Sequence, residues 1–238
     1  MKNQVFNFIV VLALLSFDIG VKAQRTDVKD KGLKGMVTSV TTREYGFSQS
    51  FGETSKGSLK ETSQFDFDSK GNITKEYSKS TVYNYNNQYS NGKLISQDLF
   101  AENGYLYQKI KYTYTGNGYV KTTYNSDGSV KTTVTKRGNV LITKEGAGTT
   151  TEYLNAQGKE YKTDASLAGI DVTSSTAHNA NGDPISKKMN LSFGYNGRNR
   201  IITFKAYKYD KHRNWTYREK YQDGSPDIIE ERDIIYAY

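Results

Sequence analysis

The chain has 238 residues, a formal net charge of +8 at pH 7, 21 glycines, 20 tyrosines, two prolines and no cysteine. The absence of cysteine excludes disulfides and thiolate metal sites. Lys and Glu are interspersed rather than clustered, which argues against nucleic-acid binding, because that function usually shows basic patches. Length and composition are typical of one all-β domain.

The first 23 residues have the pattern of a secretory signal peptide. Lys2 precedes an apolar run from Val5 to Phe17, and Val21-Lys22-Ala23 is a small-x-small cleavage pattern. We therefore expect cleavage after Ala23 and export to the periplasm, the cell surface or the medium. The apolar run is shorter than the roughly 20 residues that span a bilayer, and no second run follows, so we expect no transmembrane segment after cleavage.

Residues 24–32 are charged and lack an apolar period, so we expect a flexible lead-in with at most one turn of helix. Residues 33–238 then form a single β-repeat domain. Alternating side chains predict a first strand over 33–45, and residues 47–58 are expected to form a long hairpin loop. Further strands separated by glycine- and asparagine-containing turns are predicted over 59–67, 73–80, 82–89, 93–100 and 105–114.

Glycine then recurs in steps of ten, at positions 118, 128, 138, 148 and 158. Between these glycines, Thr, Val, Tyr and Ile alternate with Lys and Glu, a composition that suits a pleated sheet with one face in water. The stretch from 111 to 158 therefore predicts short strands joined by tight turns.

The ten-residue step is interrupted at 164–183. This segment is either a short helical turn around 166–170 or one strand with a long loop, and periodicity does not decide between them. After Asn181-Gly182-Asp183 the strand pattern resumes over 185–195, 200–209, 215–221 and 228–238.

These elements predict about a dozen short strands in a long antiparallel β-meander of hairpin repeats. Open twisted sheets of more than about ten strands usually curl, so we expect an all-β trough or partly closed barrel. A membrane-spanning barrel is disfavoured, because most predicted strands have about six or seven residues whereas such a barrel needs roughly 9–11. No uniformly apolar outer face can be drawn either.

Two segments, FDFDSKGNITKEY at 65–77 and YKYDKHRNWTYREKYQDGSPDII at 207–229, resemble the tyrosine-aspartate (YD or RHS-type) repeats. In such repeats an aromatic-x-aromatic-Asp run, a Gly-Asn turn, an apolar residue and Thr form one β-hairpin. The opening at 33–37 is also similar to that of small exported YD-type proteins of Gram-negative envelopes. The resemblance implies a β-hairpin array and no particular activity. The matching positions are Phe65, Phe67, Asp68, Gly71, Asn72, Ile73 and Thr74, then Tyr207, Tyr209, Asp210, Asn214, Trp215 and Thr216, with Arg213 where the pattern has glycine.

Candidate catalytic and metal sites are few. The two histidines, His178 and His212, fall in predicted turns, and without cysteine a zinc site would need distant carboxylates. Residues 66–71 begin like a calcium loop, but Lys70 takes a ligand position and the twelfth residue is Tyr77 rather than glutamate. The sequence also lacks a serine nucleophile elbow and a dinucleotide loop. We expect no catalytic residue, no metal and no cofactor.

The aromatic residues Tyr207, Tyr209, Trp215, Tyr217 and Tyr221 alternate along two strands that are predicted to pair. They either pack together and close the end of the sheet, or form a stacking platform for a sugar or a peptide. We therefore predict a non-enzymatic exported protein that is a structural or binding module of the cell envelope, with an envelope polysaccharide or protein as its partner. Two alternatives stay open: a carbohydrate-active hydrolase with carboxylates on 164–183, and an immunity-like binder of a secreted effector.

Overall fold

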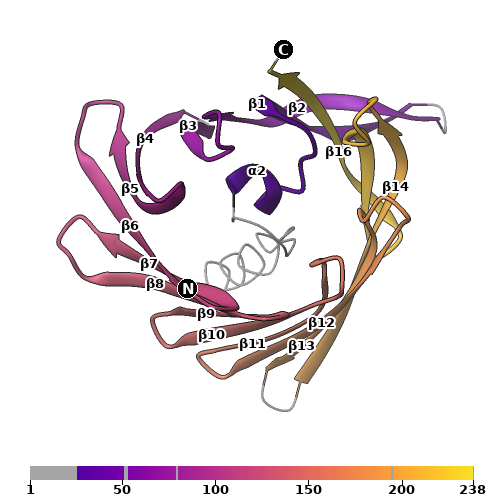
Figure 1. Cartoon of the computed structure of the whole chain (residues 1–238). Helices are drawn as coiled ribbons and strands as arrows, with labels where there is room; N and C mark the ends of the chain where they lie inside the picture. The colour runs from indigo at the N-terminus through magenta and orange to yellow at the C-terminus, as the bar shows by residue number, and fades with distance from the viewer. Residues whose placement is uncertain (1–25, 51–52, 79, 194–195, 238) are drawn as a thin grey trace.

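The computed structural model describes residues 26–50, 53–78, 80–193 and 196–237. These residues form one antiparallel β-barrel, in which successive strands pair and the first strand pairs with the last (Figure 1). The predicted all-β meander is confirmed. The sheet closes fully, whereas the sequence suggested a trough or a partly closed barrel. The predicted signal peptide lies outside the described residues.

The described part of the chain contains one short helix and sixteen strands, more than the dozen predicted. The helix is α2, Asp27–Asp30. The strands are β1 Val37–Ser50, β2 Glu53–Phe67, β3 Ile73–Ser78, β4 Thr81–Ser90, β5 Lys93–Ala101, β6 Leu106–Thr115, β7 Gly118–Asn125, β8 Val130–Arg137, β9 Val140–Glu145, β10 Gly148–Leu154, β11 Glu160–Leu167, β12 Ile170–His178, β13 Pro184–Phe193, β14 Asn196–Tyr209, β15 Trp215–Gln222 and β16 Ser225–Tyr236.

Several strands are longer than the sequence suggested. β1, β2 and β14 have 14, 15 and 14 residues, where strands over 33–45, 59–67 and 200–209 were expected, and β1 and β2 include most of the predicted hairpin loop at 47–58. Strand length therefore does not distinguish this barrel from a membrane-spanning one. The polarity of the outward-facing side chains is the property that distinguishes them. Among the described residues, no helix is long and apolar enough to cross a membrane.

Strand pairing continues through residues 164–183, where the sequence suggested an interruption. This segment contains the end of β11, a two-residue turn at Ala168 and Gly169, all of β12 and the following turn. Ala168 and Gly169 both have positive φ, at 50° and 78°. A tight turn of that kind joins two strands without a helix or a long loop.

Six hairpins in the described residues share one turn geometry. In each, the first residue donates its N–H to the carbonyl oxygen of the residue four positions later, and the fourth residue donates back to the first. The fourth position has positive φ, which glycine adopts without steric cost. Among the glycines that recur in steps of ten, this requirement explains Gly128 and Gly158. The turns begin at Asp68, Ala101, Asn125, Asn155, Asn179 and Asp210.

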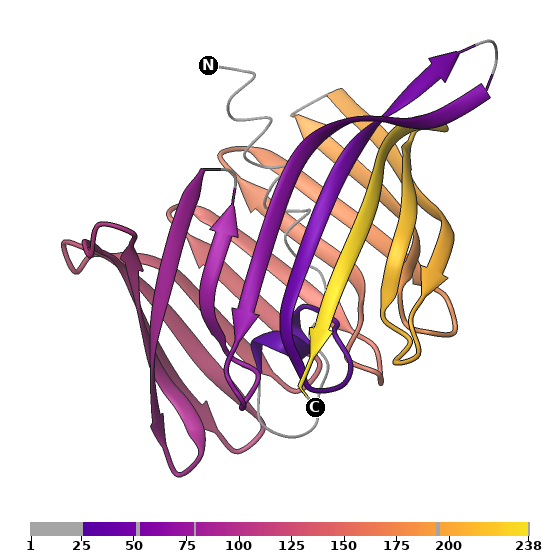
Figure 2. The same cartoon turned by 90° about the horizontal axis from the view of Figure 1, so that it is seen from above.

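Residues 26–36 close one end of the barrel from inside. α2 lies within the ring of strands in Figure 1 and near one end of the barrel in Figure 2. Val28 donates its backbone N–H to the Gly71 carbonyl at 3.0 Å, and Lys34 donates its N–H to Asn214 Oδ1 at 2.8 Å. The sequence predicted a flexible lead-in over 24–32. Its described residues instead dock, because Val28 packs into a buried apolar cluster that includes Val40.

Residues 26–36 form a plug at this end of the barrel, and charged side chains of the plug also point into the barrel. Asp27 Oδ2 accepts a hydrogen bond from the backbone N–H of Ile73 at 2.8 Å. The Lys31 ammonium lies 3.2 Å from the centre of the Phe65 ring. Burial lowers the pKa of Lys31 to about 8, although the charges of Glu76 and Asp27 oppose the shift.

The inner face of the wall is identified by Gln97, whose Nε2 donates to Asp27 of α2 at 3.3 Å. Gln97 lies opposite Ile110 on β6, and paired residues share a face of the sheet. The inner wall mixes apolar, hydroxyl and charged side chains. One inner row follows strand pairing from β6 to β14 through Tyr112, Lys121, Val134, Thr143, Thr150, Ala165, Val172, Leu191 and Arg198.

The outer wall carries the intervening residues and is hydrophilic. Because side chains alternate along a strand, neighbours of the inner row point to solvent. Nearly every side chain in this outer row is charged or carries a hydroxyl. A membrane-spanning barrel would present an apolar band to lipid at this place. The row from β5 to β14 is Ser96, Lys111, Thr122, Thr133, Lys144, Thr149, Ser166, Asp171, Ser192 and Gly197.

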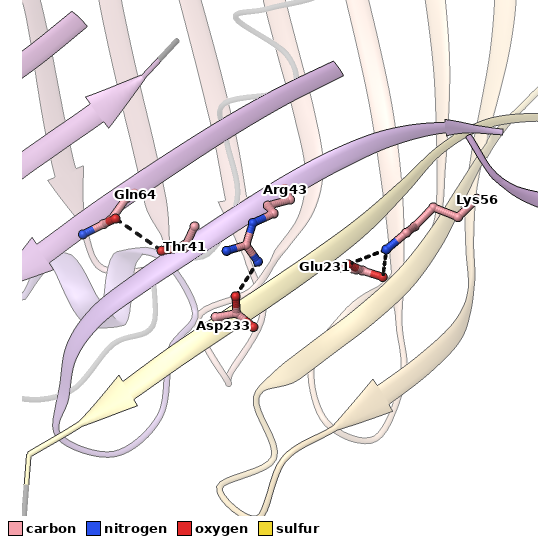
Figure 3. Close-up of polar contacts among 6 residues, drawn as sticks. All are labelled: Thr41, Arg43, Lys56, Gln64, Glu231 and Asp233. Atoms are coloured by element: carbon pink, nitrogen blue, oxygen red, sulfur yellow. Dashed lines mark hydrogen bonds and ion pairs between the residues drawn. The ribbon is translucent and has the colours of Figure 1, made fainter. Parts of the chain in front are cut away.

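The barrel closes along the seam between β1 and β16, where antiparallel pairing runs from Val37 to Gly46 on β1. Polar contacts cross the outer side of this seam and of the adjoining β2 (Figure 3). Arg43 on β1 forms an ion pair with Asp233 on β16. Lys56 on β2 reaches over to Glu231, with 3.0 Å between Nζ and Oε1. The seam is therefore joined by side chains as well as by the backbone ladder.

Candidate functional site

The five aromatic residues singled out in the sequence do not form one surface. Trp215 is buried, with 4% of its surface exposed. Two guanidinium groups contact its ring, with Arg218 Cζ 4.1 Å and Arg232 Cζ 3.6 Å from the ring centre. Stacked cations of this kind stabilise the inside of the wall. Trp215 is therefore a packing residue of the barrel interior.

Tyr207 and Tyr209 are stacked on each other, with ring centres 5.7 Å apart and planes 15° apart. The Tyr207 hydroxyl donates to the Pro184 carbonyl at 2.5 Å, and Asn179 Nδ2 donates to the Tyr209 hydroxyl at 2.8 Å. Burial raises the pKa of Tyr207 above its ordinary value. Both rings therefore fasten β14 to the turn between β12 and β13.

Tyr217 and Tyr221 alone among the five point outward together. Both hydroxyls donate to the carboxylate of Glu219, at 2.9 and 2.8 Å. Burial and the hydrogen bond to Glu219 raise the pKa of Tyr217 to about 12. The split of the five residues follows from two irregularities in the pairing of β14 with β15: one at Ala206, which has φ of 53°, and one at Thr216, which is the extra residue between Trp215 and Tyr217. A bulge redirects the side chains that follow it, and alternation in the sequence does not reveal one.

An open groove of about 600 Å³ lies across β11, β12, β13 and β14. Most of its lining side chains belong to the outer wall, as their strand pairing and exposure show. They form two rows that cross the strands. One row consists of Thr173, Asn190 and Asn199, and the other of Lys162, Ser175, Lys188 and Ile201.

Direct cross-strand pairing gives the groove a regular spacing. Asn190 lies opposite both Thr173 and Asn199, and Lys188 lies opposite both Ser175 and Ile201. Opposed side chains on antiparallel strands have Cβ atoms about 4.5–5.5 Å apart. The groove is thus a lattice of amide, hydroxyl and ammonium groups on a rigid sheet.

Most of these polar groups have no partner within the described chain. No hydrogen bond or ion pair from the described residues engages the side chains of Thr173, Ser175, Lys188, Asn190 or Asn199. Lys162 differs, because its Nζ lies 2.8 Å from Asp164 Oδ2, and that hydrogen bond raises the pKa of Lys162. The groove therefore offers donors and acceptors that the fold itself does not use.

An exposed aromatic ring borders the groove. Tyr161 is 47% exposed and lines the groove at β11. Its ring centre lies 6.5 Å from that of Tyr153 on β10, and the Lys162 ammonium lies 5.0 Å from the Tyr153 ring. Tyrosine presents a large rigid face at low entropic cost, which suits contact with a flat ligand.

The inner wall contains a row of charged side chains, and two of its carboxyl groups have pKa values shifted in opposite directions, as in a catalytic acid–base pair. Arg218, Glu230, Glu44 and Glu61 are direct neighbours across β15, β16, β1 and β2. Burial would raise the pKa of Glu230, but the charge and hydrogen bonds of Arg218 outweigh it and hold that pKa below its usual value. Burial and the charge of Glu230 raise the pKa of Glu44.

Diverging pKa values are typical of catalytic carboxylate pairs. Here, however, both Glu230 oxygens are bonded to Arg218, so that carboxylate is occupied by a structural ion pair. On the outer wall, Asp164 is bonded to Lys162 and Asp171 is exposed, so nothing encloses a general acid there. No group of three or more His, Cys, Asp or Glu that could hold a metal occurs in the described residues.

Sequence reasoning missed the groove because its residues come from four strands whose register is not visible in the sequence. The available signal was the alternation of Thr173 with Ser175 and of Lys188 with Asn190. That alternation is equally typical of an ordinary solvated sheet face. Only the pairing of β12 with β13 and of β13 with β14 brings the amides together.

No protein-family model matches the sequence, and no curated protein matches it. Among solved structures, the chain is similar to a porin-like protein from Bacteroides uniformis, with 10% sequence identity and a TM-score of 0.37, covering 85% of this chain and 98% of that one. It is also similar to a porin-like protein from Bacteroides vulgatus, with 12% identity and a TM-score of 0.38, covering 85% of this chain and 99% of that one. Because both similarities are distant, function is inferred from this chain's own side chains.

Proposed function

We propose that this protein is a non-enzymatic, exported binding module that holds a hydroxyl-rich polymer of the cell envelope in its outer groove. The observation that carries the proposal is a groove of about 600 Å³ whose lining includes five polar side chains that no described residue engages, those of Thr173, Ser175, Lys188, Asn190 and Asn199. Sugar hydroxyls both donate and accept hydrogen bonds. Side-chain amides such as those of Asn190 and Asn199 do the same, so the two chemistries are complementary.

The rigidity of the site supports binding rather than mere solvation. Asn190 and Asn199 lie opposite each other within a closed barrel, so little backbone order remains to be gained when a ligand binds. Tyr161 adds an exposed ring at the border, where a sugar ring can stack. The spread of the groove over four strands suits an extended polymer more than a compact metabolite.

The hydrophilic outer wall supports a barrel that works in water rather than in lipid. Export is proposed from the signal-peptide pattern of the first 23 residues. The intact mass of the protein recovered from the periplasm or the medium tests export, because cleavage after Ala23 removes a known mass. A full-length mass in both fractions contradicts it.

Affinity electrophoresis tests the binding function. The protein is run through native gels that contain single soluble polysaccharides, both neutral and acidic. We expect at least one polymer to retard the wild type. The double variant Asn190→Ala/Asn199→Ala should bind that polymer about thirtyfold more weakly, because two hydrogen bonds of about 1 kcal/mol each are lost.

The matched control is Thr122→Ala/Thr133→Ala, which removes two opposed polar side chains from the outer wall of β7 and β8, away from the groove. This control should migrate like the wild type in every gel. Equal retardation of the Asn190→Ala/Asn199→Ala variant and the wild type would show that the groove is not the binding site. If no polymer retards the wild type, the proposed function is wrong.

A further inference from the structure

The charge balance of the groove indicates what kind of polymer it accepts, and this step rests on the proposed function. Two lysines on the outer wall line the groove, Lys162 and Lys188. Lys162 is neutralised by Asp164 at 2.8 Å. Lys188 is exposed, and no described residue pairs with it. Arg200 also lines the groove, but its paired neighbour Met189 is buried on the inner side, so its charge belongs to the other face.

Lys188 occupies the middle of the groove. It lies between Ser175 on β12 and Ile201 on β14, and Asn190 follows it by two residues on the same face. Two residues along a strand correspond to about 7 Å. The Lys188 ammonium and the Asn190 amide are therefore about one sugar ring apart, and the Ser175 hydroxyl lies opposite Lys188 on the neighbouring strand. An acidic sugar unit in the groove would meet the ammonium with its carboxylate and the amide and hydroxyl with its ring hydroxyls.

We propose that the groove selects an anionic glycan and that Lys188 pairs with a carboxylate carried by one of its sugar units. The surrounding amides and hydroxyls bind the ring hydroxyls, and Tyr161 contacts the face of a neighbouring ring. A single ammonium among neutral groups differs from the continuous basic stripe that follows a nucleic-acid backbone. The chemistry therefore favours a uronate-bearing glycan over an oligonucleotide.

The experiment compares two probes that differ in charge and by one methyl group per sugar: oligogalacturonate and the same oligomer with its carboxylates methyl-esterified. Calorimetric titration of the wild type should give about tenfold tighter binding of the acid form, since a charge-assisted hydrogen bond contributes about 1.5 kcal/mol or more. The preference should shrink as salt is added, because the pair is exposed.

The variant Lys188→Gln keeps a polar side chain, one atom shorter than lysine, and removes its charge. It should bind acid and ester equally, with the affinity that the wild type has for the ester. Lys144→Gln on β9, exposed on the outer wall but outside the groove, is the matched control and should keep the full preference.

The outcomes separate the two proposals. If the wild type binds the acid and the ester equally, the charge selection is wrong and the polymer-binding function stands. If neither oligomer binds while another glycan is retarded in the gels, the uronate assignment alone fails. If a single-stranded oligonucleotide binds more tightly than the acid and depends on Lys188, the ligand class is wrong. Failure of every glycan removes both proposals.

Discussion

Asn72 and Asn214 make the same hydrogen bond from two separate hairpin turns. Asn72 Nδ2 donates to the Tyr89 hydroxyl at 3.0 Å, and Asn214 Nδ2 donates to the Tyr236 hydroxyl at 2.7 Å. In each turn the tyrosine donates in turn to the aspartate that starts it. Both turns also hold the plug formed by residues 26–36, so two equivalent turns fix the closed end of the barrel.

Replacement of Asn214 should weaken the plug and the barrel together. Asn214 is buried, accepts from the Lys34 N–H and donates to both the Lys34 carbonyl and the Tyr236 hydroxyl. Asn214→Ala should lower the free energy of unfolding by about 3 kcal/mol, because three partly buried groups lose a bond: the Lys34 N–H, the Lys34 carbonyl and the Tyr236 hydroxyl. Urea unfolding measures the loss, and hydrogen exchange should show faster exchange across 26–36. Asn199→Ala, an exposed asparagine without a partner in the described chain, should change neither quantity.

Arg213 occupies a backbone conformation that favours glycine. Its φ is 62°, and Gly71 has φ of 78° at the equivalent position of the other turn. Arg213→Gly should raise the free energy of unfolding by up to about 1 kcal/mol, because a left-handed conformation costs a non-glycine residue about 1–2 kcal/mol and glycine loses more entropy on folding. Thermal unfolding provides the measurement.

The reciprocal change is Gly71→Ala, which should lower stability by about 1 kcal/mol. Its added Cβ would lie 3.4 Å from the side chains of Thr26 and Val28, an ordinary contact, so the cost comes from the backbone. Gly116→Ala is the control, since its φ is not positive and its Cβ would meet nothing within 4 Å. Equal effects of Gly71→Ala and Gly116→Ala would contradict the backbone explanation.

Much of the local structure could be predicted from the sequence, because turns and alternation are local properties. The residues that resemble a YD-type repeat mark two turns of the same geometry, including Asn72, Asn214 and the strained Arg213. Closure could not be predicted in this way. It depends on pairing between Val37 and Tyr236, which lie near opposite ends of the chain, and no local pattern reports that contact.

The candidate site was less predictable than the fold. Trp215 was expected either to pack at the end of the sheet or to join a stacking platform, and the irregular pairing around Thr216 leaves its indole inside the wall, apart from Tyr217. The groove arises from the register of β12, β13 and β14, which is set by the whole barrel. Polar side chains on a strand have the same sequence pattern whether or not a groove surrounds them.

Glu44 should make stability depend on pH. Burial raises its pKa, and the charges of Glu230 and Glu61 add to the shift. A carboxyl with a raised pKa in the folded state binds its proton more tightly there than in the unfolded chain, so its ionisation destabilises the fold. Glu44→Gln should therefore raise the melting temperature at pH 7.5.

The gain from Glu44→Gln should vanish below the unfolded pKa of about 4.5, where the wild-type carboxyl is neutral in both states. Melting curves recorded between pH 3.5 and pH 8, in steps of roughly one pH unit, would show the trend, because this range extends to both sides of a typical glutamate pKa. Glu102→Gln, at an exposed glutamate, serves as the control and should shift the curve by the same small amount at every pH. A pH-independent effect of Glu44→Gln would contradict the assignment.

Lys187 and Glu160 form a deeply buried ion pair on the inner wall. Their side chains are 1% and 6% exposed, and Lys187 Nζ lies 3.3 Å from Glu160 Oε2. Thr163 and Thr176 donate to the other carboxylate oxygen, at 2.8 and 3.2 Å. Lys187→Met should lower the free energy of unfolding by about 3–5 kcal/mol, because it leaves the carboxylate charged and buried without its cation.

The double variant Lys187→Met/Glu160→Gln removes both charges and keeps an amide oxygen as acceptor for Thr163 and Thr176. It should recover most of the loss, because a buried ion pair contributes little compared with a well-packed neutral replacement. Urea unfolding of the wild type, both single variants and the double variant gives the coupling energy. The exposed pair between Lys162 and Asp164 is the reference, and Lys162→Met should lower the free energy of unfolding far less than Lys187→Met does. A double variant no more stable than Lys187→Met alone would show that the lysine stabilises the wall through packing of its methylene chain, not through its charge.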